Sequence, residues 1–272
     1  APDPEVEKLR TENAELKKKL EAKAKTDAAR DDATTDFEKA QAAKPEWAEK
    51  LDALLKKGIA GYKSADFFAL VGELKKLGKE GVDKLAEKLL RAESAGERFL
   101  AGALLEDLGD PAAIPALAKS LQQDDDLLVR RMSSHAIAMI KNEAGLTALR
   151  AAMSSDTDWG VRVNSAYGVA KLGQPDGVKM LEDSYLSAST PAEYKIAVLG
   201  GLADVASPSS APVFRKVLGE STDVTYLFLV ISAVEKLKDP SFVPDLNRIA
   251  GDAKYAANVR EMAKKAADGL SK

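Results

Sequence analysis

The chain has 272 residues and no cysteine, and its 40 basic and 43 acidic residues give a net charge of −3. This near balance argues against a general binder of nucleic acids or anionic membranes, which needs a basic face. The lack of cysteine excludes disulfides, thiolate metal sites and a cysteine nucleophile. No apolar run approaches the roughly 18 residues of a transmembrane helix, so we expect no direct membrane insertion.

The chain begins at Ala1, and no basic segment followed by an apolar one marks an intact signal peptide. The opening Ala-Pro-Asp-Pro can follow a cleaved export segment or mark an arbitrary boundary. We take an exported, periplasmic location as the expectation over a cytoplasmic one, with both alternatives open.

Residues 1–44 differ in composition from the rest of the chain, because apolar residues are sparse and charged ones dense. Near the start, residues recur at alternating spacings of three and four: Val6, Leu9, Asn13, Leu16 and Leu20. This is the a/d pattern of a coiled coil, in which an Asn at an a position favours a two-stranded register. Fewer than three heptads are present, so a short helix that frays alone is the alternative. We expect a coiled-coil or tether helix over 1–44, with a homodimer through this seam as the first alternative.

From about residue 45 onward the sequence repeats with a nearly fixed period. Equivalent positions lie 31–33 residues apart at Phe67, Arg98, Arg130, Arg162, Lys195, Leu227 and Arg260. A period of this length marks a stacked repeat architecture, because one short unit cannot bury its apolar face alone. The repeats reach the C-terminus without a linker, so we expect a single repeat domain over 45–272.

Each repeat predicts two helices and no strand. The first helices are expected over 45–57, 79–91, 111–122, 143–154, 175–187, 208–219 and 240–251. The second helices are expected over 64–77, 94–108, 126–141, 158–172, 191–206, 223–237 and 256–270. Prolines suit the starts of first helices, and Asp126, Asp158 and Asp223 suit the N-caps of second helices. The fold class is therefore an all-α solenoid of about seven helical pairs.

The register within the second helices predicts which side chains are buried. Apolar or small residues recur at fixed positions around each repeat, so Ile137 and Leu172 are expected in the core and Lys171 on the surface. We expect ion pairs within one helix between Asp126 and Arg130 and between Asp158 and Arg162. The two members of each pair are four residues apart, and each aspartate also caps its helix.

The motif Asp158-Trp-Gly-Val161-Arg162, followed by Val169-Ala-Lys-Leu172-Gly173-Gln-Pro175, resembles HEAT repeats, specifically the short PBS-lyase HEAT-like variety. The resemblance covers about residues 45–272 and implies an α-solenoid whose second helices line the concave side. The family includes scaffolds, adaptors and subunits of enzymes that attach or remove bilin pigments. The motif implies no catalytic residue, because its Arg, Asp and Pro are structural.

No metal, cofactor or catalytic site is predicted. His135 is the single histidine, and one imidazole without cysteine does not make a typical zinc site. The serines in turns have no histidine placed to activate them. Gly200 and Gly201 fall in the middle of a helix and are interpreted as close-packing positions.

The expected concave side carries more apolar and aromatic residues than a solvated face needs. We predict that a lane of residues binds a partner: Phe99, Arg131, His135, Val163, Tyr167, Ile196 and Phe228. Asp107, Lys171 and Asp204 form its charged rim. The alternative is that strong curvature buries these side chains against one another.

The leading functional hypothesis is a non-enzymatic scaffold or adaptor that binds a protein or peptide on the concave lane. A bilin or tetrapyrrole lyase-like enzyme or chaperone subunit is the second; it would need a polar pocket built from His135, Tyr167, Arg131 and Asp107. A DNA-binding repair protein ranks last, because its groove would be lined with basic residues, whereas this rim alternates Asp and Lys.

Overall fold

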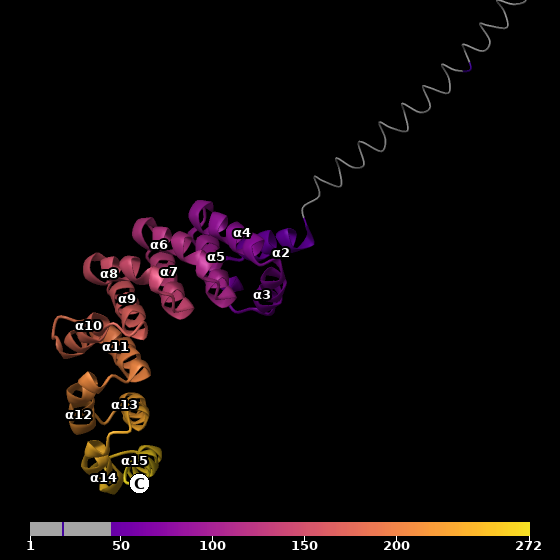
Figure 1. Ribbon diagram of the computed structural model, residues 1–272. Helices are drawn as coiled ribbons and strands as arrows, with labels where there is room; N and C mark the ends of the chain where they lie inside the picture. The colour runs from indigo at the N-terminus through magenta and orange to yellow at the C-terminus, as the bar shows by residue number, and fades with distance from the viewer. Residues whose placement is uncertain (1–17, 19–44) are drawn as a thin grey trace, which may run out of the picture. The chain divides into compact units, whose positions relative to one another are not determined.

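The computed structural model describes Lys18 and residues 45–272 (Figure 1). The chain divides into two units, Ala1–Leu51 and Asp52–Lys272. The predicted seam lies outside the described residues: Val6, Leu9, Asn13, Leu16 and Leu20. The coiled coil and the homodimer therefore remain predictions.

The described residues form α-helices joined by short turns, with no strand among them. The helices are α2 (Glu46–Leu55), α3 (Ala65–Leu77), α4 (Lys79–Arg91), α5 (Ala95–Leu108), α6 (Ile114–Gln123), α7 (Leu127–Ile140), α8 (Leu146–Ser155), α9 (Trp159–Lys171), α10 (Pro175–Leu186), α11 (Ala192–Val205), α12 (Ala211–Glu220), α13 (Val224–Leu237), α14 (Val243–Gly251) and α15 (Ala257–Leu270). Single 3₁₀ turns are η1 (Gly58–Gly61), η2 (Pro111–Ala113), η3 (Glu143–Gly145), η4 (Pro208–Ser210) and η5 (Pro240–Phe242). The predicted all-α solenoid is confirmed.

Within Asp52–Lys272 the helices stack as consecutive pairs. From α4 onward each even-numbered helix packs on the odd-numbered helix that follows it, and successive odd-numbered helices pack side by side. The stack curves, with α5, α7, α9, α11, α13 and α15 on its inner side and the even-numbered helices on its outer side (Figure 1). We call the exposed side of these odd-numbered helices the inner surface.

Small residues let neighbouring helices approach closely. A Cβ added to Gly177 on α10 would lie 2.4 Å from the backbone nitrogen of Ala170 on α9. A Cβ on Gly168 would lie 2.8 Å from the Cβ of Ala138 on α7. Such contacts are too short for any real side chain, so glycine is required where α9 meets α7 and α10.

Two of the predicted burial positions need correction at the end of α9. Ile137 is fully buried, as expected. Leu172, however, is the C-cap of α9 and is only partly buried. Lys171, expected on the surface, has a side chain only 15% exposed.

Aspartates cap the second helices as predicted. The Oδ1 atom of Asp126 accepts the backbone N–H groups of Leu128 and Val129 at 2.8 and 3.2 Å. The Oδ1 atom of Asp158 accepts the N–H of Val161 at 2.9 Å. Each cap satisfies N–H groups that have no partner within the helix.

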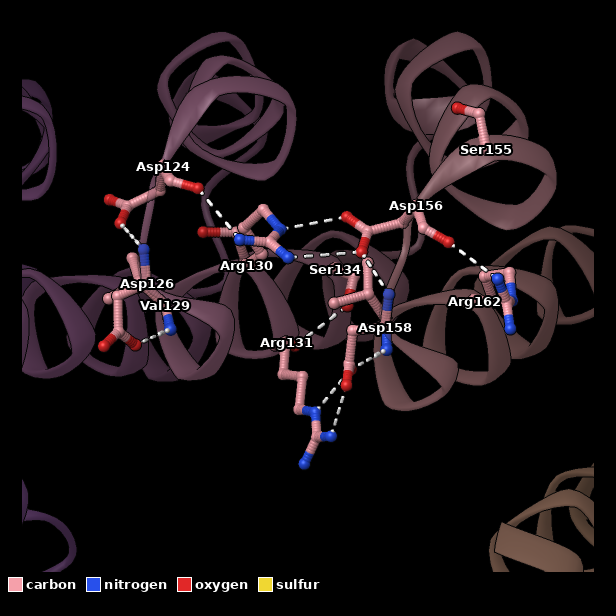
Figure 2. Close-up of polar contacts among 12 residues, drawn as sticks. Asp124, Asp126, Val129, Arg130, Arg131, Ser134, Ser155, Asp156, Asp158 and Arg162 are labelled. Atoms are coloured by element: carbon pink, nitrogen blue, oxygen red, sulfur yellow. Dashed lines mark hydrogen bonds and ion pairs between the residues drawn. The ribbon is translucent and has the colours of Figure 1, made fainter. Parts of the chain in front are cut away.

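The repeat arginines join successive units along the loop edge, an arrangement that we call the arginine ladder. Arg98 donates from Nε and Nη2 to the two carboxylate oxygens of Asp124 at 2.8 and 2.9 Å. Arg130 makes the same paired contact with Asp156 at 3.0 and 3.3 Å (Figure 2). In both, Nη1 donates to carbonyl groups at the end of the preceding first helix.

The ladder overturns the predicted ion pairs between residues four apart. Arg130 pairs with Asp156 in the next unit, not with Asp126. Asp158 pairs with Arg131, and Arg162 donates to the backbone carbonyl of Asp156 at 2.8 Å (Figure 2). The caps explain the difference, because each capping carboxylate turns toward backbone N–H groups and away from the side chain one turn later.

Candidate interaction surface

The predicted lane residues all lie on the odd-numbered helices. They are Phe99 on α5, Arg131 and His135 on α7, Val163 and Tyr167 on α9, Ile196 on α11 and Phe228 on α13. Ile196 is 41% exposed, and five others are partly buried. The odd-numbered helices also expose Phe68 on α3 and Met139 on α7.

Val163 is not available to a partner. Its side chain is 3% exposed and belongs to the apolar core that also contains Val198 and Leu199 of α11. Val163 therefore packs within the core where α9 meets α11.

Arg131 joins three units of the inner surface. It donates from Nε and Nη2 to the carboxylate of Asp158 at 2.6 Å each (Figure 2). Nη2 also donates to the Tyr194 hydroxyl at 2.8 Å. The hydrogen bond from Arg131 holds the pKa of Asp158 below its ordinary value. Arg131 is therefore committed to contacts within the chain and holds α7, α9 and α11 together.

A second network joins α9 to α11 at the predicted rim. The Tyr167 hydroxyl donates to Oδ2 of Asp204 at 2.7 Å, and Lys171 Nζ donates to the same atom at 2.8 Å. Lys171 also donates to the Tyr167 hydroxyl at 3.0 Å. On the other side, Nζ of Lys236 on α13 lies 3.7 Å from Oδ1 of Asp204. The hydrogen bonds from Lys171 and Tyr167 lower the pKa of Asp204 to about 2.

This network predicts a pH-dependent contribution to stability. The pKa of Asp204 in the folded protein lies below the ordinary value of 3.8. The ionised carboxylate therefore stabilises the fold at pH values above 3.8, and this contribution is lost as pH falls through about 2. The side chain is 46% exposed, so solvent screening limits the effect to about 1 kcal/mol.

We expect Asp204→Asn to lower the free energy of unfolding by about 1 kcal/mol at pH 7, in urea titrations followed by circular dichroism. The difference in free energy of unfolding between this variant and the unmodified protein should decrease between pH 4 and pH 2. Asp183→Asn, which removes an exposed pair with Lys179, should change stability by at most about 0.5 kcal/mol. If the difference in free energy of unfolding for Asp204→Asn stays constant with pH, the ionised Asp204 carboxylate is not the stabilising group.

Acidic side chains gather between α5 and α7. Nε2 of His135 lies 3.5 Å from Oε1 of Glu106. Oε2 of Glu106 and Oδ2 of Asp107 are shielded from solvent and accept no hydrogen bond. Among the described residues no group of three or more such side chains could hold a metal ion.

The four residues of the lyase-like hypothesis do not form one cluster. Arg131 binds Asp158 and Tyr194, Tyr167 binds Asp204, and His135 faces Glu106. Asp107 makes no hydrogen bond to any of the other three. The structure thus distributes these groups over separate networks.

Gly200 and Gly201 on α11, both interpreted from the sequence as close-packing glycines, differ in their surroundings. A Cβ on Gly201 would contact Leu181 and Tyr167 at 3.4 Å, as expected for a packing glycine. A Cβ on Gly200 would have no atom within 4 Å. Only Gly201 is therefore a close-packing position, and Gly200 leaves the middle of α11 uncovered beside the exposed Ile196.

A match to a family model supports the repeat assignment. Residues 82–170 match the family model described as HEAT repeats. The chain is similar to the structure of human deoxyhypusine hydroxylase in complex with glycerol, with 18% identity, 83% of this chain and 86% of that chain covered, and a TM-score of 0.38. It is also similar to the complex of CpcE and CpcF of phycocyanin lyase from Nostoc sp. PCC7120, with 17% identity, 79% and 86% coverage, and a TM-score of 0.45.

No curated protein matches the chain. The predicted resemblance to HEAT-like repeats is confirmed by the family match, which spans α4 to α9. HEAT repeats suggest a protein-interaction scaffold. Across the described residues, no helix has the length and apolar character needed to cross a membrane.

Proposed function

We propose that this HEAT-repeat chain is a non-enzymatic scaffold that binds a partner protein or peptide on its inner surface, centred on α11. The observation that carries the proposal is the pairing of Gly200 with the exposed Ile196, one turn apart on the same helix. No catalytic residue, cofactor or nucleic acid enters this proposal.

A glycine in the middle of a helix destabilises the fold by about 0.5–1 kcal/mol relative to alanine. Where a neighbour packs against it, as at Gly201, the lack of a side chain has a structural reason. Gly200 has no such neighbour, and Ile196 beside it exposes 41% of its surface. Glycine is favoured where another backbone approaches closely, so this face of α11 suits a partner segment packed against it.

The surroundings of α11 suit recognition as well as contact. Phe228 holds the repeat position of Ile196 on the neighbouring helix α13 and is partly exposed. The charged network of Tyr167, Lys171 and Asp204 borders the same surface and is fixed by its own hydrogen bonds. Such a fixed charged border selects the partner and its orientation more than it adds affinity.

The predicted coiled-coil seam within residues 1–44 adds a second element to the proposal. A dimer through the predicted seam would present two inner surfaces, and binding both at once would raise the overall affinity without new contacts.

The test compares two uncovered glycines on opposite sides of the solenoid. Gly219 on the outer helix α12 also has no atom within 4 Å of an added Cβ. Changing either glycine to Ala should raise the free energy of unfolding by about 0.4–1 kcal/mol. Gly200→Leu should reduce partner capture at least tenfold, because its side chain occupies the space for the partner.

Capture is measured by affinity chromatography from an extract of the source organism, with bound proteins identified by mass spectrometry. Gly219→Leu should capture the same proteins as the unmodified chain, and Ile196→Ser should lose those that Gly200→Leu loses. Identical captured proteins for all four chains would contradict binding at α11.

A further inference from the structure

The C-caps of α6, α8 and α10 are equivalent positions on the loop edge, occupied by Asp124, Asp156 and Ser187. Each side chain accepts the backbone N–H two residues later, at 3.0, 2.8 and 3.1 Å. Each carbonyl accepts a hydrogen bond from the basic residue of the second helix that follows. Serine therefore stands where the two preceding units have aspartate.

This change leaves one arginine of the ladder without a carboxylate. Arg98 is paired with Asp124 and Arg130 with Asp156, but Arg162 meets the unit in which Ser187 holds the equivalent position. Arg162 donates to the carbonyl of Asp156 (Figure 2). Its guanidinium carbon lies 4.1 Å from the centre of the Trp159 ring. It makes no ion pair within the described part of the chain.

A cavity of about 430 Å³ lies beside this arginine–tryptophan stack. Its apolar lining comes from Trp159 and Met180, and Ser187 lies at its edge. Thr190 also lines it, and this side chain is 4% exposed with a hydroxyl that has no hydrogen-bond partner. A buried hydroxyl without a partner is unfavourable, so a ligand that bonds to it gains affinity.

The charged residues that line the cavity are already paired. Asp176 pairs with Arg150 at 2.8 Å, and Asp183 pairs with Lys179 at 2.9 Å. Arg162, which stacks on the lining residue Trp159, is therefore the neighbouring charge without a counterpart. A guanidinium positioned over an aromatic ring can still present its remaining N–H groups as the planar fork that matches a carboxylate.

We propose that Arg162 and this cavity bind an aspartate or glutamate side chain of a partner protein, followed by an apolar residue. The carboxylate takes the place that Asp124 and Asp156 hold in the preceding units. The adjoining backbone bonds to the Thr190 hydroxyl, and the apolar side chain packs on Trp159 and Met180. This site lies on the loop edge and does not depend on the function proposed for α11.

The probe is the peptide acetyl-Glu-Leu-amide, and the signal is the indole resonance of Trp159 in the full chain carrying Trp47→Phe. We expect a saturable shift with a Kd of about 1 mM, in the range of a small ligand with one charged contact. Acetyl-Gln-Leu-amide should bind at least tenfold more weakly, because it lacks the charge. Acetyl-Gln-Leu with a free C-terminal carboxylate should also bind weakly; binding equal to the Glu peptide would overturn the side-chain assignment.

Variants at Ser187 give the sharpest control. Ser187→Asp supplies the absent carboxylate from within the chain, so it should pair with Arg162 and abolish peptide binding. Ser187→Asn keeps the same turn without a charge and should leave binding within about twofold. Arg162→Gln should lose binding while circular dichroism reports an unchanged helix content. Equal binding by Ser187→Asp and Ser187→Asn, or equal binding of the Glu and Gln amides, would overturn the proposal.

Discussion

Replacing Asp156 with Ala is expected to lower the free energy of unfolding by about 3 kcal/mol, near the lower end for a broken buried ion pair. The Asp156 side chain is 9% exposed and that of Arg130 is 15% exposed. The change leaves the Arg130 guanidinium shielded without its carboxylate, and it also removes the acceptor for the N–H of Asp158. Urea denaturation followed by circular dichroism measures the loss.

The same ladder offers a matched control. Asp125 also pairs with an arginine, Arg98, at 2.8 Å, but its side chain is 93% exposed. Asp125→Ala should therefore change the free energy of unfolding by less than about 1 kcal/mol. Similar losses for Asp156→Ala and Asp125→Ala would show that burial does not decide the strength of these pairs.

Ile137→Ala is expected to cost about 2–5 kcal/mol, because it removes buried methyl groups and leaves a cavity that its neighbours only partly fill. Ile137 is fully buried on α7. Its Cγ2 methyl packs on Gly145 so closely that a Cβ there would lie 2.2 Å from it. Denaturant titration measures the effect.

Ile196→Ala is the control for this prediction, because Ile196 is the same residue type on an equivalent inner helix and is 41% exposed. Surface substitutions usually change stability by less than about 0.5 kcal/mol. A larger loss for Ile196→Ala than for Ile137→Ala would contradict the observed helical register.

Sequence periodicity predicted the helices closely because it reports burial, and burial repeats with each unit. The second helix expected over 126–141 is α7, Leu127–Ile140, and the one expected over 158–172 is α9, Trp159–Lys171. The starts of several first helices differ, because a 3₁₀ turn such as Pro111–Ala113 precedes the α-helix. Proline at the first position permits either geometry, so spacing alone does not separate them.

The arginine ladder was missed because helical spacing describes only neighbours on one helix. Asp126 and Arg130 satisfy the rule for residues four apart, but the partner of Arg130 lies 26 residues away. The periodic signal was nevertheless present: an aspartate ends the first helix in two successive units, Asp124 and Asp156. Comparing C-cap positions between repeats would have identified both pairs and the serine that follows.

The candidate surface was predicted only in outline, because exposure depends on how adjacent helices pack. Val163 and Ile196 hold the same repeat position, yet the first is buried and the second is exposed. The repeat position alone therefore does not decide exposure, because it does not report the local packing of each helix pair. Gly200 and Gly201 were both interpreted as close-packing glycines, and the surroundings of each Cβ show that only Gly201 packs against a neighbour.

Temperature should affect the stability of the repeat units before Ser187 and after it unequally. The cost of desolvating a charged pair such as Arg130 with Asp156 falls as temperature rises, whereas the stabilisation from apolar burial weakens on cooling. Beyond Ser187 the loop edge has no equivalent arginine–carboxylate pair in the described chain, while the apolar core continues to Ala267. Cooling should therefore destabilise the C-terminal units more than the units joined by the arginine ladder. Heating should increase the contribution of the ladder's ion pairs to stability.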